Sequence, residues 1–497
     1  MSMLNKKTSY KDIAKTSVLF GSSQIVIVIT KIIKTKFVAY FLGTYGYGIF
    51  SLFTAAVNLI GTFSNLGLNT SATKSIAENH KDNENVIKTL TIVRKIVWLT
   101  GFMGGFICLL LSSFLSEIIF NNSDFTYAIM WLSIAIVLNQ LTQGNTILLR
   151  GLRRHKNLAN SNATGAIIGL IISVTLYYIW GINAIVPAII LSSFAAYLRS
   201  AYFANKIKVD WIPIGLRDTF NASRPMLAMG IVLSITSVLT LSKVFFLRIY
   251  VEGVGGIEEV GLYHSSFIIV NSYLGIIFTI MSTDYLPDLS TKIHDRKLYT
   301  DLFNKQLIFG MMLIIPLVCA FLLFNQWIIV LLFNSKFKGA ELLIAWSVLG
   351  MFFKLISWTQ SFIILSKGDN KRFALHETTS IVITTIITVL LYNEFGLHGL
   401  GIGFTIGYFY YSLQTYFLCW YWYKIDFNKE SKTIIFVGAL ILASAFYSIV
   451  ILKNIGLCII ITLISFMFSY WQMKKMGFIT KIKSLLKRKS DKLQNGR

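Results

Sequence analysis

The sequence predicts an all-α integral membrane protein with about 14 transmembrane helices, arranged as two pseudo-symmetric six-helix lobes plus two C-terminal helices. Three observations support this fold. Of the 497 residues, 55% are hydrophobic and only 14% are charged, whereas soluble domains carry about 25% charged residues. Apolar runs of roughly 20 residues, long enough to cross a bilayer as a helix, recur from end to end. The third observation is a repeat that relates the two halves of the chain.

The apolar runs define fourteen candidate spans with loose boundaries. Residues 1–15 are basic, but the apolar run after them is too long for a cleaved signal, so we expect an uncleaved first span. The spans lie near residues 16–41, 46–71, 92–115, 126–148, 158–180, 182–204, 225–249, 261–286, 305–333, 341–365, 373–393, 397–422, 433–452 and 454–472.

The distribution of Lys and Arg predicts that both termini are cytoplasmic. With the N-terminus inside, 36 of the 46 basic residues fall in inner segments. The outer segments hold only Lys336, Lys338 and Lys453. The longest outer segment, around residues 250–260, contains EGVGGIEEV, and its glycines predict a flexible connection.

The second and eighth spans begin with similar sequences. Gly48, an aromatic residue, a valine and Asn58 recur as Gly261, an aromatic residue, a valine and Asn271, at a constant offset of 213. Internal repeats are typical of transporters, although coincidence between Phe-, Ile- and Gly-rich helices is the alternative. The repeat predicts an N-terminal lobe at 1–206, a C-terminal lobe at 207–424, two additional helices at 425–472 and a basic cytoplasmic tail at 473–497.

Several basic residues fall within the predicted spans. Lys354 stands about midway along its span, where a lysine costs about 2.5–3.5 kcal/mol on insertion scales, so we expect it to face a polar cavity or a partner. Lys31 and Lys34 share one helical face, and Lys243 lies in the first span of the second lobe. Snorkelling at a span end is the favoured interpretation for three others, namely Lys36, Arg199 and Arg248.

These cations predict a cleft that suits a di-anionic ligand. The acids Asp284 and Glu377 lie near the inner face, so the sequence offers no mid-depth carboxylate to neutralise Lys354. A pyrophosphate would offset the repulsion between lysines through charge-assisted contacts. Amides could bind sugar hydroxyls, although polar residues also hold membrane helices together. The candidate substrate-binding residues are Lys31, Lys34, Lys243, Lys354, Arg248, Asn58, Asn271, Asn139 and Gln143.

Other classes of function are disfavoured by the sequence. The net charge is +24, but the cations are spread between apolar runs, which argues against nucleic-acid binding. The cysteines Cys108, Cys319, Cys419 and Cys458 are isolated, and no HxxxH or HExxH spacing occurs, so we expect no metal, no cofactor and no catalytic residues. The sequence therefore does not predict an enzyme.

Two segments carry a resemblance to a known family. TKFVAYFLGTYGYGIFSLFTAAVNLIGTFSNLGLNTSATKSIAENHKDN (residues 35–83) and LLRGLRRHKNLANSNATGAIIG (148–169) resemble the O-antigen and polysaccharide translocases. These belong to the multidrug, oligosaccharidyl-lipid and polysaccharide flippase superfamily. The resemblance implies a two-lobed bundle that moves undecaprenyl-pyrophosphate-linked oligosaccharide from the inner to the outer leaflet of the bacterial inner membrane, by alternating access through a cationic cleft. Implied partners are the polyprenyl-pyrophosphate-linked saccharide, membrane lipids and polysaccharide polymerase or assembly proteins.

The resemblance also bears on single residues. Lys34 falls where the related lipid II flippases carry a functional arginine in their first span, so here a point charge replaces a bidentate fork. The arginines that lipid II flippases place in the second span are absent from 46–71, which argues against a peptidoglycan precursor as cargo. Two alternatives stay open: a cation-coupled drug or small-molecule exporter of the same fold, and, less favoured, a membrane glycosyl- or acyl-transferase or polymerase.

Overall fold

The chain folds into apolar helices. The structure, a computed structural model, describes all residues except 1–9, 79–82, 208, 210, 293–294 and 477–497, and the described residues contain no strand. The predicted basic tail at 473–497 therefore lies almost entirely outside the described residues. The longer helices of the first half are α1 (Tyr10–Asn65), α2 (Leu68–Glu78), α3 (Asn83–Leu110), α4 (Ser112–Phe120), α5 (Thr126–Gly151), α6 (His155–Trp180), α7 (Ile185–Asn205) and α8 (Leu216–Gly255).

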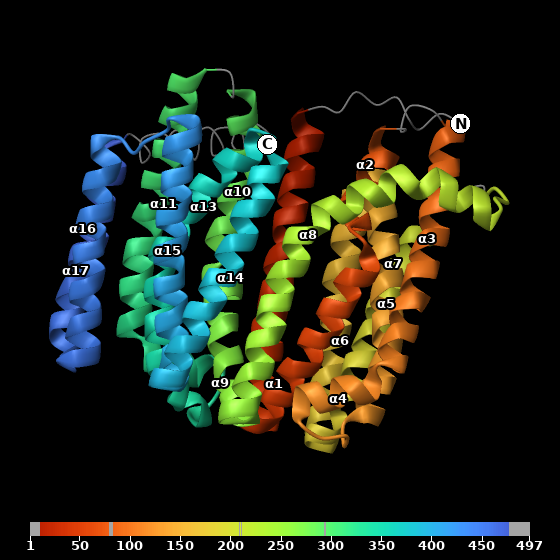
Figure 1. The fold of residues 1–497 in the computed structure, drawn as a ribbon, viewed down its shortest axis with the longest axis horizontal. Helices are drawn as coiled ribbons and strands as arrows, with labels where there is room; N and C mark the ends of the chain where they lie inside the picture. The colour runs from red at the N-terminus through yellow and green to blue at the C-terminus, as the bar shows by residue number, and fades with distance from the viewer. Residues whose placement is uncertain (1–9, 79–82, 208, 210, 293–294, 477–497) are drawn as a thin grey trace, which may run out of the picture. The chain divides into compact units, whose positions relative to one another are not determined.

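The helices of the second half continue the same pattern (Figure 1). Two π-helical segments, η3 and η5, interrupt them. The elements are α9 (Ile257–Phe267), η3 (Ile268–Leu274), α10 (Ile276–Thr291), α11 (Arg296–Leu323), α12 (Asn325–Leu332), α13 (Glu341–Ser366), α14 (Asn370–Phe395), α15 (Leu397–Tyr423), α16 (Lys429–Phe446), η5 (Tyr447–Ile451) and α17 (Ile455–Lys475).

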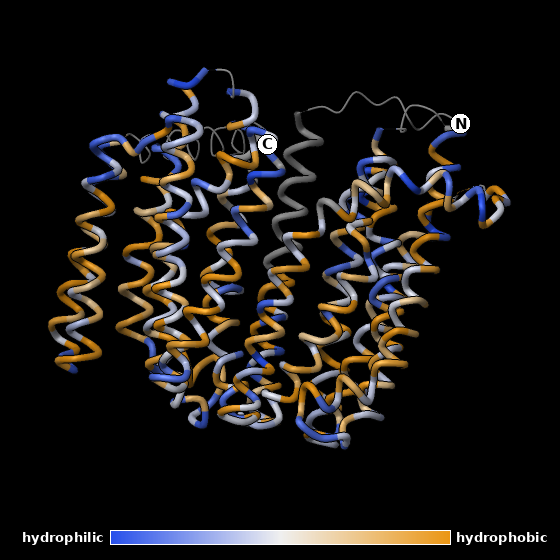
Figure 2. The backbone as a smooth tube through the Cα atoms, viewed as in Figure 1, coloured by the Kyte–Doolittle hydropathy of each residue, from blue (hydrophilic) through white to orange (hydrophobic). Residues whose placement is uncertain are grey.

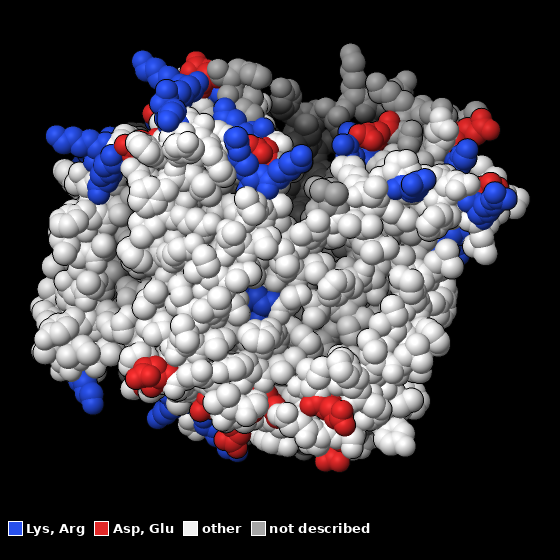
Figure 3. All heavy atoms as spheres, in the orientation of Figure 1, with Lys and Arg blue, Asp and Glu red and all other residues white. Residues whose placement is uncertain are grey.

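The helices have the composition of membrane spans. Ten stretches of the described chain are long and apolar enough to cross a membrane, and one of them, His155–Asn205, covers both α6 and α7. Each of the fourteen predicted spans falls mainly on helix, and Figure 2 shows their apolar residues extending along the helices. On the face drawn in Figure 3, charged side chains gather toward the helix ends of each unit. The chain is an all-α, multi-pass membrane protein, and the number of fourteen crossings stays a prediction.

Glycines separate consecutive helices at two predicted boundaries. The first predicted span and residues 46–65 of the second belong to one 56-residue helix, α1, which is broken at Gly43 (φ 64°). The end of the second span, predicted at 71, is wrong, because α1 ends at Asn65 and α2 begins at Leu68. At the second boundary the predicted flexible connection around 250–260 is wrong. Only Gly256 (φ 82°) separates α8 from α9. Glu258 and Glu259 lie in the first turn of α9, where acidic side chains favour a helix start, so the sequence EGVGGIEEV ends one helix and begins the next.

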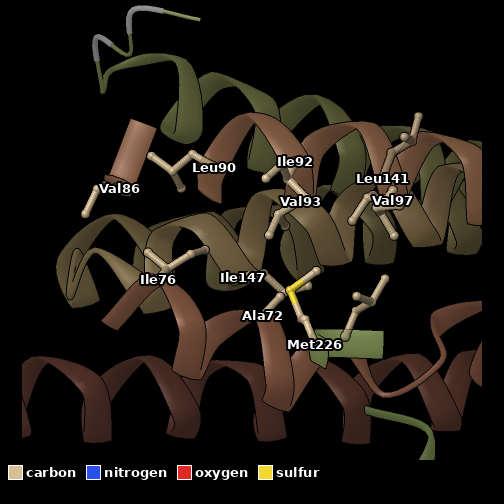
Figure 4. Packing of buried hydrophobic residues seen from close by; sticks show 12 residues of the cluster. Ala72, Ile76, Val86, Leu90, Ile92, Val93, Val97, Leu141, Ile147 and Met226 are labelled. Carbon is tan, nitrogen blue, oxygen red and sulfur yellow. The ribbon is translucent and has the colours of Figure 1, made fainter. Parts of the chain in front are cut away.

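The chain divides into two compact units. Unit 1 comprises Met1–Gly261 with Leu332–Lys336, and unit 2 comprises Leu262–Leu331 with Phe337–Arg497. In unit 1, α6 packs on α7 and α1, and α3 packs on α5. Figure 4 shows apolar side chains of α2, α3, α5 and α8 interlocking in its core. In unit 2, α13 packs against α15 and α11, α14 packs against α15, and α16 and α17 pack on α11.

Two glycines of the sequence repeat contact each other's helices within unit 1. A Cβ at Gly48 of α1 would lie 2.1 Å from the carbonyl oxygen of Ile257, and a Cβ at Gly261 of α9 would lie 2.1 Å from the carbonyl oxygen of Thr44. Only glycine allows backbones to approach this closely. The carbonyl that faces Gly48 belongs to the residue four positions before Gly261, and the carbonyl that faces Gly261 belongs to the residue four positions before Gly48. The two contacts are therefore reciprocal, and equivalent positions in them differ by 213, the offset seen in the sequence. The packing thus agrees with the predicted repeat register.

Candidate functional site

Unit 1 contains a polar cavity of ≈ 530 Å³, lined by α1, α2, α5 and α8. Eleven of its fifteen lining residues have uncharged polar side chains, and the lining includes no charged residue. Figure 2 shows hydrophilic turns partway along α5, the helix that contributes the glutamines. Because α5 is also one of the candidate membrane spans, the cavity places amides and hydroxyls beside an otherwise apolar helix.

Helical spacing brings the lining residues together. On α1, Asn58, Gly61, Thr62 and Asn65 are separated by three or four positions and therefore share one face. On α5, Asn139, Gln140, Thr142 and Gln143 form the opposing wall, and on α8 Ser234 and Ser237 complete it. Three of the predicted site residues, Asn58, Asn139 and Gln143, thus line one cavity.

The amides of this cavity divide into two groups. Asn65 Nδ2 donates to Gln140 Oε1 at 3.2 Å, and Gln140 Nε2 donates to Thr100 Oγ1 at 3.0 Å, so this pair joins α1, α5 and α3. The side-chain amides of Asn58, Asn139 and Gln143 form no hydrogen bond with any described residue. They keep both a donor and an acceptor for a ligand.

The sequence reasoning missed part of this cavity. Asn65, Asn69, Ser234 and Ser237 were not among the candidates, yet all four line it. The seven-residue spacing between Asn58 and Asn65 was the available signal, since it places both on one helical face. Asn69 Oδ1 is buried and accepts no hydrogen bond from the described part of the chain. The serines of α8 are distant in sequence and carried no such signal.

The predicted cations of unit 1 are not part of the cavity lining. Lys31 is exposed, and Lys34 and Lys243 are half-buried. Arg248 is only 4% exposed, and its Nη1 donates to the carbonyl oxygen of Ser51 at 2.8 Å, so it joins α8 to α1 instead of snorkelling toward a helix end. Arg199 Nε donates to Thr164 Oγ1 at 3.0 Å.

Unit 2 contains the predicted pair Lys354 and Asn271. Lys354 Nζ on α13 donates to Asn271 Oδ1 at 2.7 Å. The ammonium also lies 5.3 Å from the ring centroid of Tyr408, 5.7 Å from that of Phe278 and 5.9 Å from that of Phe404. Aromatic faces attract a cation within about 6 Å. Asn271 belongs to the π-helical segment η3, a type of irregularity that is frequent at functional sites.

The two repeated asparagines have corresponding surroundings. Asn58 shares the cavity of unit 1 with residues of α5, the fourth predicted span. Asn271 binds Lys354 of α13, the fourth predicted span of the second lobe. In each unit the repeated asparagine therefore lies beside the helix that the predicted repeat places fourth. Uncharged amides occupy that helix in unit 1 and an ammonium occupies it in unit 2.

Glu377, one of the two acids that the sequence places near the inner face, has its own hydrogen-bond network. Tyr411 Oη donates to Glu377 Oε1, and Tyr411 and Ser361 hydroxyls lie 2.8 Å apart. His376 Nε2 lies 3.1 Å from the Thr415 hydroxyl. These bonds join α14 to α15 and α13. Among the described residues, no three His, Cys, Asp or Glu side chains are grouped in a way that could hold a metal ion.

Curated relatives are similar over most of their length. The chain is 25% identical over 381 residues to a putative O-antigen transporter of Shigella flexneri, covering 74% of this chain and 88% of that protein. It is 22% identical over 402 residues to the lipid III flippase of Escherichia coli K12, covering 78% of this chain and 93% of that protein.

Solved structures share the fold. An inward-facing multidrug resistance MATE family transporter of the MOP superfamily superimposes with a TM-score of 0.65 at 14% identity, over 83% of this chain and 95% of that chain. The lipid II flippase MurJ in an inward closed conformation gives 0.63 at 15% identity, over 94% of this chain and 100% of that chain. A family profile described as polysaccharide biosynthesis protein matches residues 37–342. Because this match spans more than half of the sequence, the chain belongs to the family of polysaccharide biosynthesis proteins.

Proposed function

We propose that the chain is a flippase that moves an undecaprenyl-pyrophosphate-linked oligosaccharide, an O-antigen or other surface polysaccharide repeat unit, from the inner to the outer leaflet. The observation that carries this proposal is the cavity of unit 1, with its uncharged amides and hydroxyls. A saccharide presents many hydroxyl groups, each of which donates and accepts a hydrogen bond. Amide side chains supply both partners, so such a cavity suits sugar and not bulk lipid. The named flippase and transporter relatives support the same cargo class.

The charge of the cavity disfavours the alternatives. Exporters of organic cations favour buried carboxylates, and the cavity lining contains none. A glycosyl- or acyl-transferase or a polymerase requires a grouped set of acid, base or nucleophile side chains around a cavity. The cavity of unit 1 is lined by neutral amides and hydroxyls instead. Binding of the saccharide part of the cargo therefore explains this lining better than a catalytic role does.

Lys354 is the proposed contact for the pyrophosphate. Its ammonium already has a fixed position, because Asn271 accepts one of its hydrogen bonds and aromatic rings surround it. An ammonium binds phosphate oxygens through charge-assisted hydrogen bonds, which is the contact proposed here. Lys31, Lys34 and Lys243 belong to the same proposal as additional cations along the path.

The proposed cycle is a rocking of the two lobes, 1–206 and 207–424, with residues 425–472 as an appended helix pair. The proposed location is the bacterial inner membrane, with both termini cytoplasmic. Polysaccharide polymerase or assembly proteins are proposed partners.

Complementation tests the cargo. A bacterium that lacks its own surface-polysaccharide flippase is expected to recover surface polysaccharide when it expresses this chain. Full-length expression in the membrane without any recovered polysaccharide, across hosts with different repeat units, would contradict the proposal. Resistance to cationic drugs in the same cells would favour the exporter instead.

Loss of the cavity amides is expected to reduce transport. Asn58→Leu and Gln143→Leu each remove hydrogen bonds worth about 0.5–1.5 kcal/mol, which predicts up to about a tenfold lower rate of polysaccharide export per substitution. The measurement is surface polysaccharide per unit of membrane-inserted protein. Asn145→Leu on the same helix is the contrast, because Asn145 Nδ2 donates to Ser200 Oγ at 2.9 Å and its loss should mainly lower the melting temperature. Equal export by Asn58→Leu, Gln143→Leu and the parent chain would exclude this cavity from the path.

Cysteine labelling is expected to show the orientation. The four natural cysteines are buried, so their background reaction with a membrane-impermeant maleimide should be low. Val254→Cys, at a position that is 61% exposed beside the α8–α9 boundary, should react in intact cells. His155→Cys, at the exposed start of α6, should react only after the cells are opened. The reverse pattern would place the termini outside.

A further inference from the structure

A second groove lies in unit 1 between α3 and the segment leading into α8. It has a volume of ≈ 370 Å³. Its walls combine aromatic and aliphatic side chains with two cations, so the groove is amphiphilic, unlike the neutral polar cavity described above. The lining residues are Thr91, Arg94, Lys95, Trp98, Leu99, Trp211, Ile212 and Leu216.

The cationic end of the groove is built around Arg94. Its guanidinium lies 4.4 Å from the centroid of the Trp211 ring, and the side chain is exposed. Arg94 forms no hydrogen bond or ion pair with any described residue. Stacking holds the face of the guanidinium and leaves its in-plane N–H donors available, which is the geometry that binds a phosphate bidentately. Lys95 Nζ donates to the carbonyl oxygen of Ile214, which fastens the segment before α8 onto α3.

An apolar stripe continues from the groove along α3. Leu99 is 50% exposed, Phe102 is 56% exposed and Phe106 is 60% exposed. Their spacing of three and four residues places them on one helical face, and all lie within the candidate membrane span Glu84–Leu110. Trp98 and Phe102 stack with ring centroids 5.5 Å apart. The surface therefore passes from cation through tryptophan to hydrocarbon contacts, the order found from head group to acyl chain in a bilayer.

The groove lies on the other side of α5 from the polar cavity. Leu141, Gly144 and Leu148 of α5 line a small pocket together with Trp98 and Trp211. The α5 amides that line the polar cavity belong to Asn139, Gln140 and Gln143, none of which lines this small pocket. A lipid in this groove is thus separated from the proposed saccharide path by α5, which argues for a resident membrane lipid and against the transported one.

We propose that Arg94, Lys95, Trp98 and Trp211 form a binding site for an anionic glycerophospholipid, whose phosphate contacts Arg94 and whose acyl chains lie on the α3 stripe. A lipid held this way joins α3 to the connection between α7 and α8. Because α8 contributes Ser234 and Ser237 to the polar cavity, the bound lipid stabilises one wall of that cavity from a distance. The site does not depend on the identity of the cargo.

Native mass spectrometry of the purified full-length chain, titrated with phosphatidylglycerol or phosphatidylcholine, tests the site. We expect phosphatidylglycerol to be retained preferentially and to raise the melting temperature. Arg94→Gln should weaken this retention about fivefold, and Arg94→Lys, which keeps the charge but loses the fork, should give an intermediate value. Arg154→Gln, at an exposed arginine outside the groove, is the matched control and should retain phosphatidylglycerol like the parent chain.

Three results would overturn the proposal. Equal retention of the zwitterionic and anionic lipids would exclude a phosphate site for anionic lipid. Equal losses in Arg94→Gln and Arg154→Gln would show a diffuse attraction to the basic surface. Displacement of phosphatidylglycerol by an equimolar amount of undecaprenyl phosphate would assign the groove to the cargo lipid. Lipid retention is measured without transport. A chain that fails as a flippase can therefore still support or contradict the lipid site.

Discussion

Lys354→Met is expected to reduce polysaccharide export at least tenfold, approaching a hundredfold, while the protein stays in the membrane. A charge-assisted hydrogen bond contributes about 1.5–3 kcal/mol, and each 1.4 kcal/mol corresponds to a factor of ten. Methionine is unbranched and only one atom shorter than lysine, so it should keep most of the apolar contact near Phe278 and Tyr408. Removal of the intramembrane ammonium also removes an insertion cost of about 2.5–3.5 kcal/mol. This gain offsets the free-energy cost of leaving Asn271 Oδ1 without its hydrogen bond.

The measurement is complementation of a flippase-deficient host, normalised to the amount of protein in the membrane. Lys354→Arg keeps the charge and should retain part of the activity. Asn271→Leu removes the hydrogen bond of 2.7 Å that positions the ammonium, so its activity should fall between those of Lys354→Arg and Lys354→Met. Full export by Lys354→Met at equal abundance would remove the cationic contact from the mechanism and leave only the neutral cavity.

Gly48→Leu and Gly261→Leu are expected to prevent stable folding. At either position a Cβ would lie 2.1 Å from a backbone carbonyl oxygen, a distance that no side-chain rotation relieves. Overpacking costs typically about 1–3 kcal/mol even where side chains can move, so a clash with backbone belongs at or above the upper end of this range. Such a loss is a large part of the total stability of about 5–15 kcal/mol that is usual for folded domains.

Gly61→Ala on the same helix is the matched control. The added Cβ at Gly61 meets no atom within 4 Å, and alanine is the better helix former, so stability should be unchanged or slightly higher. The readout is the melting temperature in detergent together with the fraction of monodisperse protein after extraction. A Gly48→Leu chain that melts like the parent would show that the close approach of α1 and α9 is dispensable.

The all-α membrane fold could be predicted from the sequence because membrane helices have a strong local signal. Apolar length located the helices. The two-lobe repeat, read from Gly, an aromatic residue, Val and Asn at an offset of 213, stays a prediction, and the contacts of Gly48 and Gly261 keep that offset. The connection around 250–260 lacks the flexibility that its glycines predict, because helix continues through most of them. In the structure, Gly253 and Gly255 lie within the last turn of α8, and only Gly256 adopts a left-handed φ.

The candidate site was only partly accessible to sequence reasoning. Asn139 and Gln143 could be grouped because they are neighbours on one helix, and Lys354 stood out because its charge lies in an apolar span. The serines of α8 could not be found, because their approach to α1 and α5 depends on tertiary packing. Arg248 was interpreted from its position near a span end, whereas its burial depends on the carbonyl of Ser51, a partner almost two hundred positions away in the chain.

The reciprocal glycine contact also constrains how the two halves can have diverged. At Gly48 and Gly261 each half supplies the surface against which the other packs, so a larger side chain on one partner cannot be accommodated by mutating the other. Asn58 and Asn271, the asparagines of the same sequence repeat, belong to different units. Their surroundings differ, with a neutral hydrogen-bonding wall beside Asn58 and a positive charge beside Asn271. Under the proposed function, the predicted repeat would assign the saccharide to the amides beside Asn58 and the pyrophosphate to the ammonium beside Asn271.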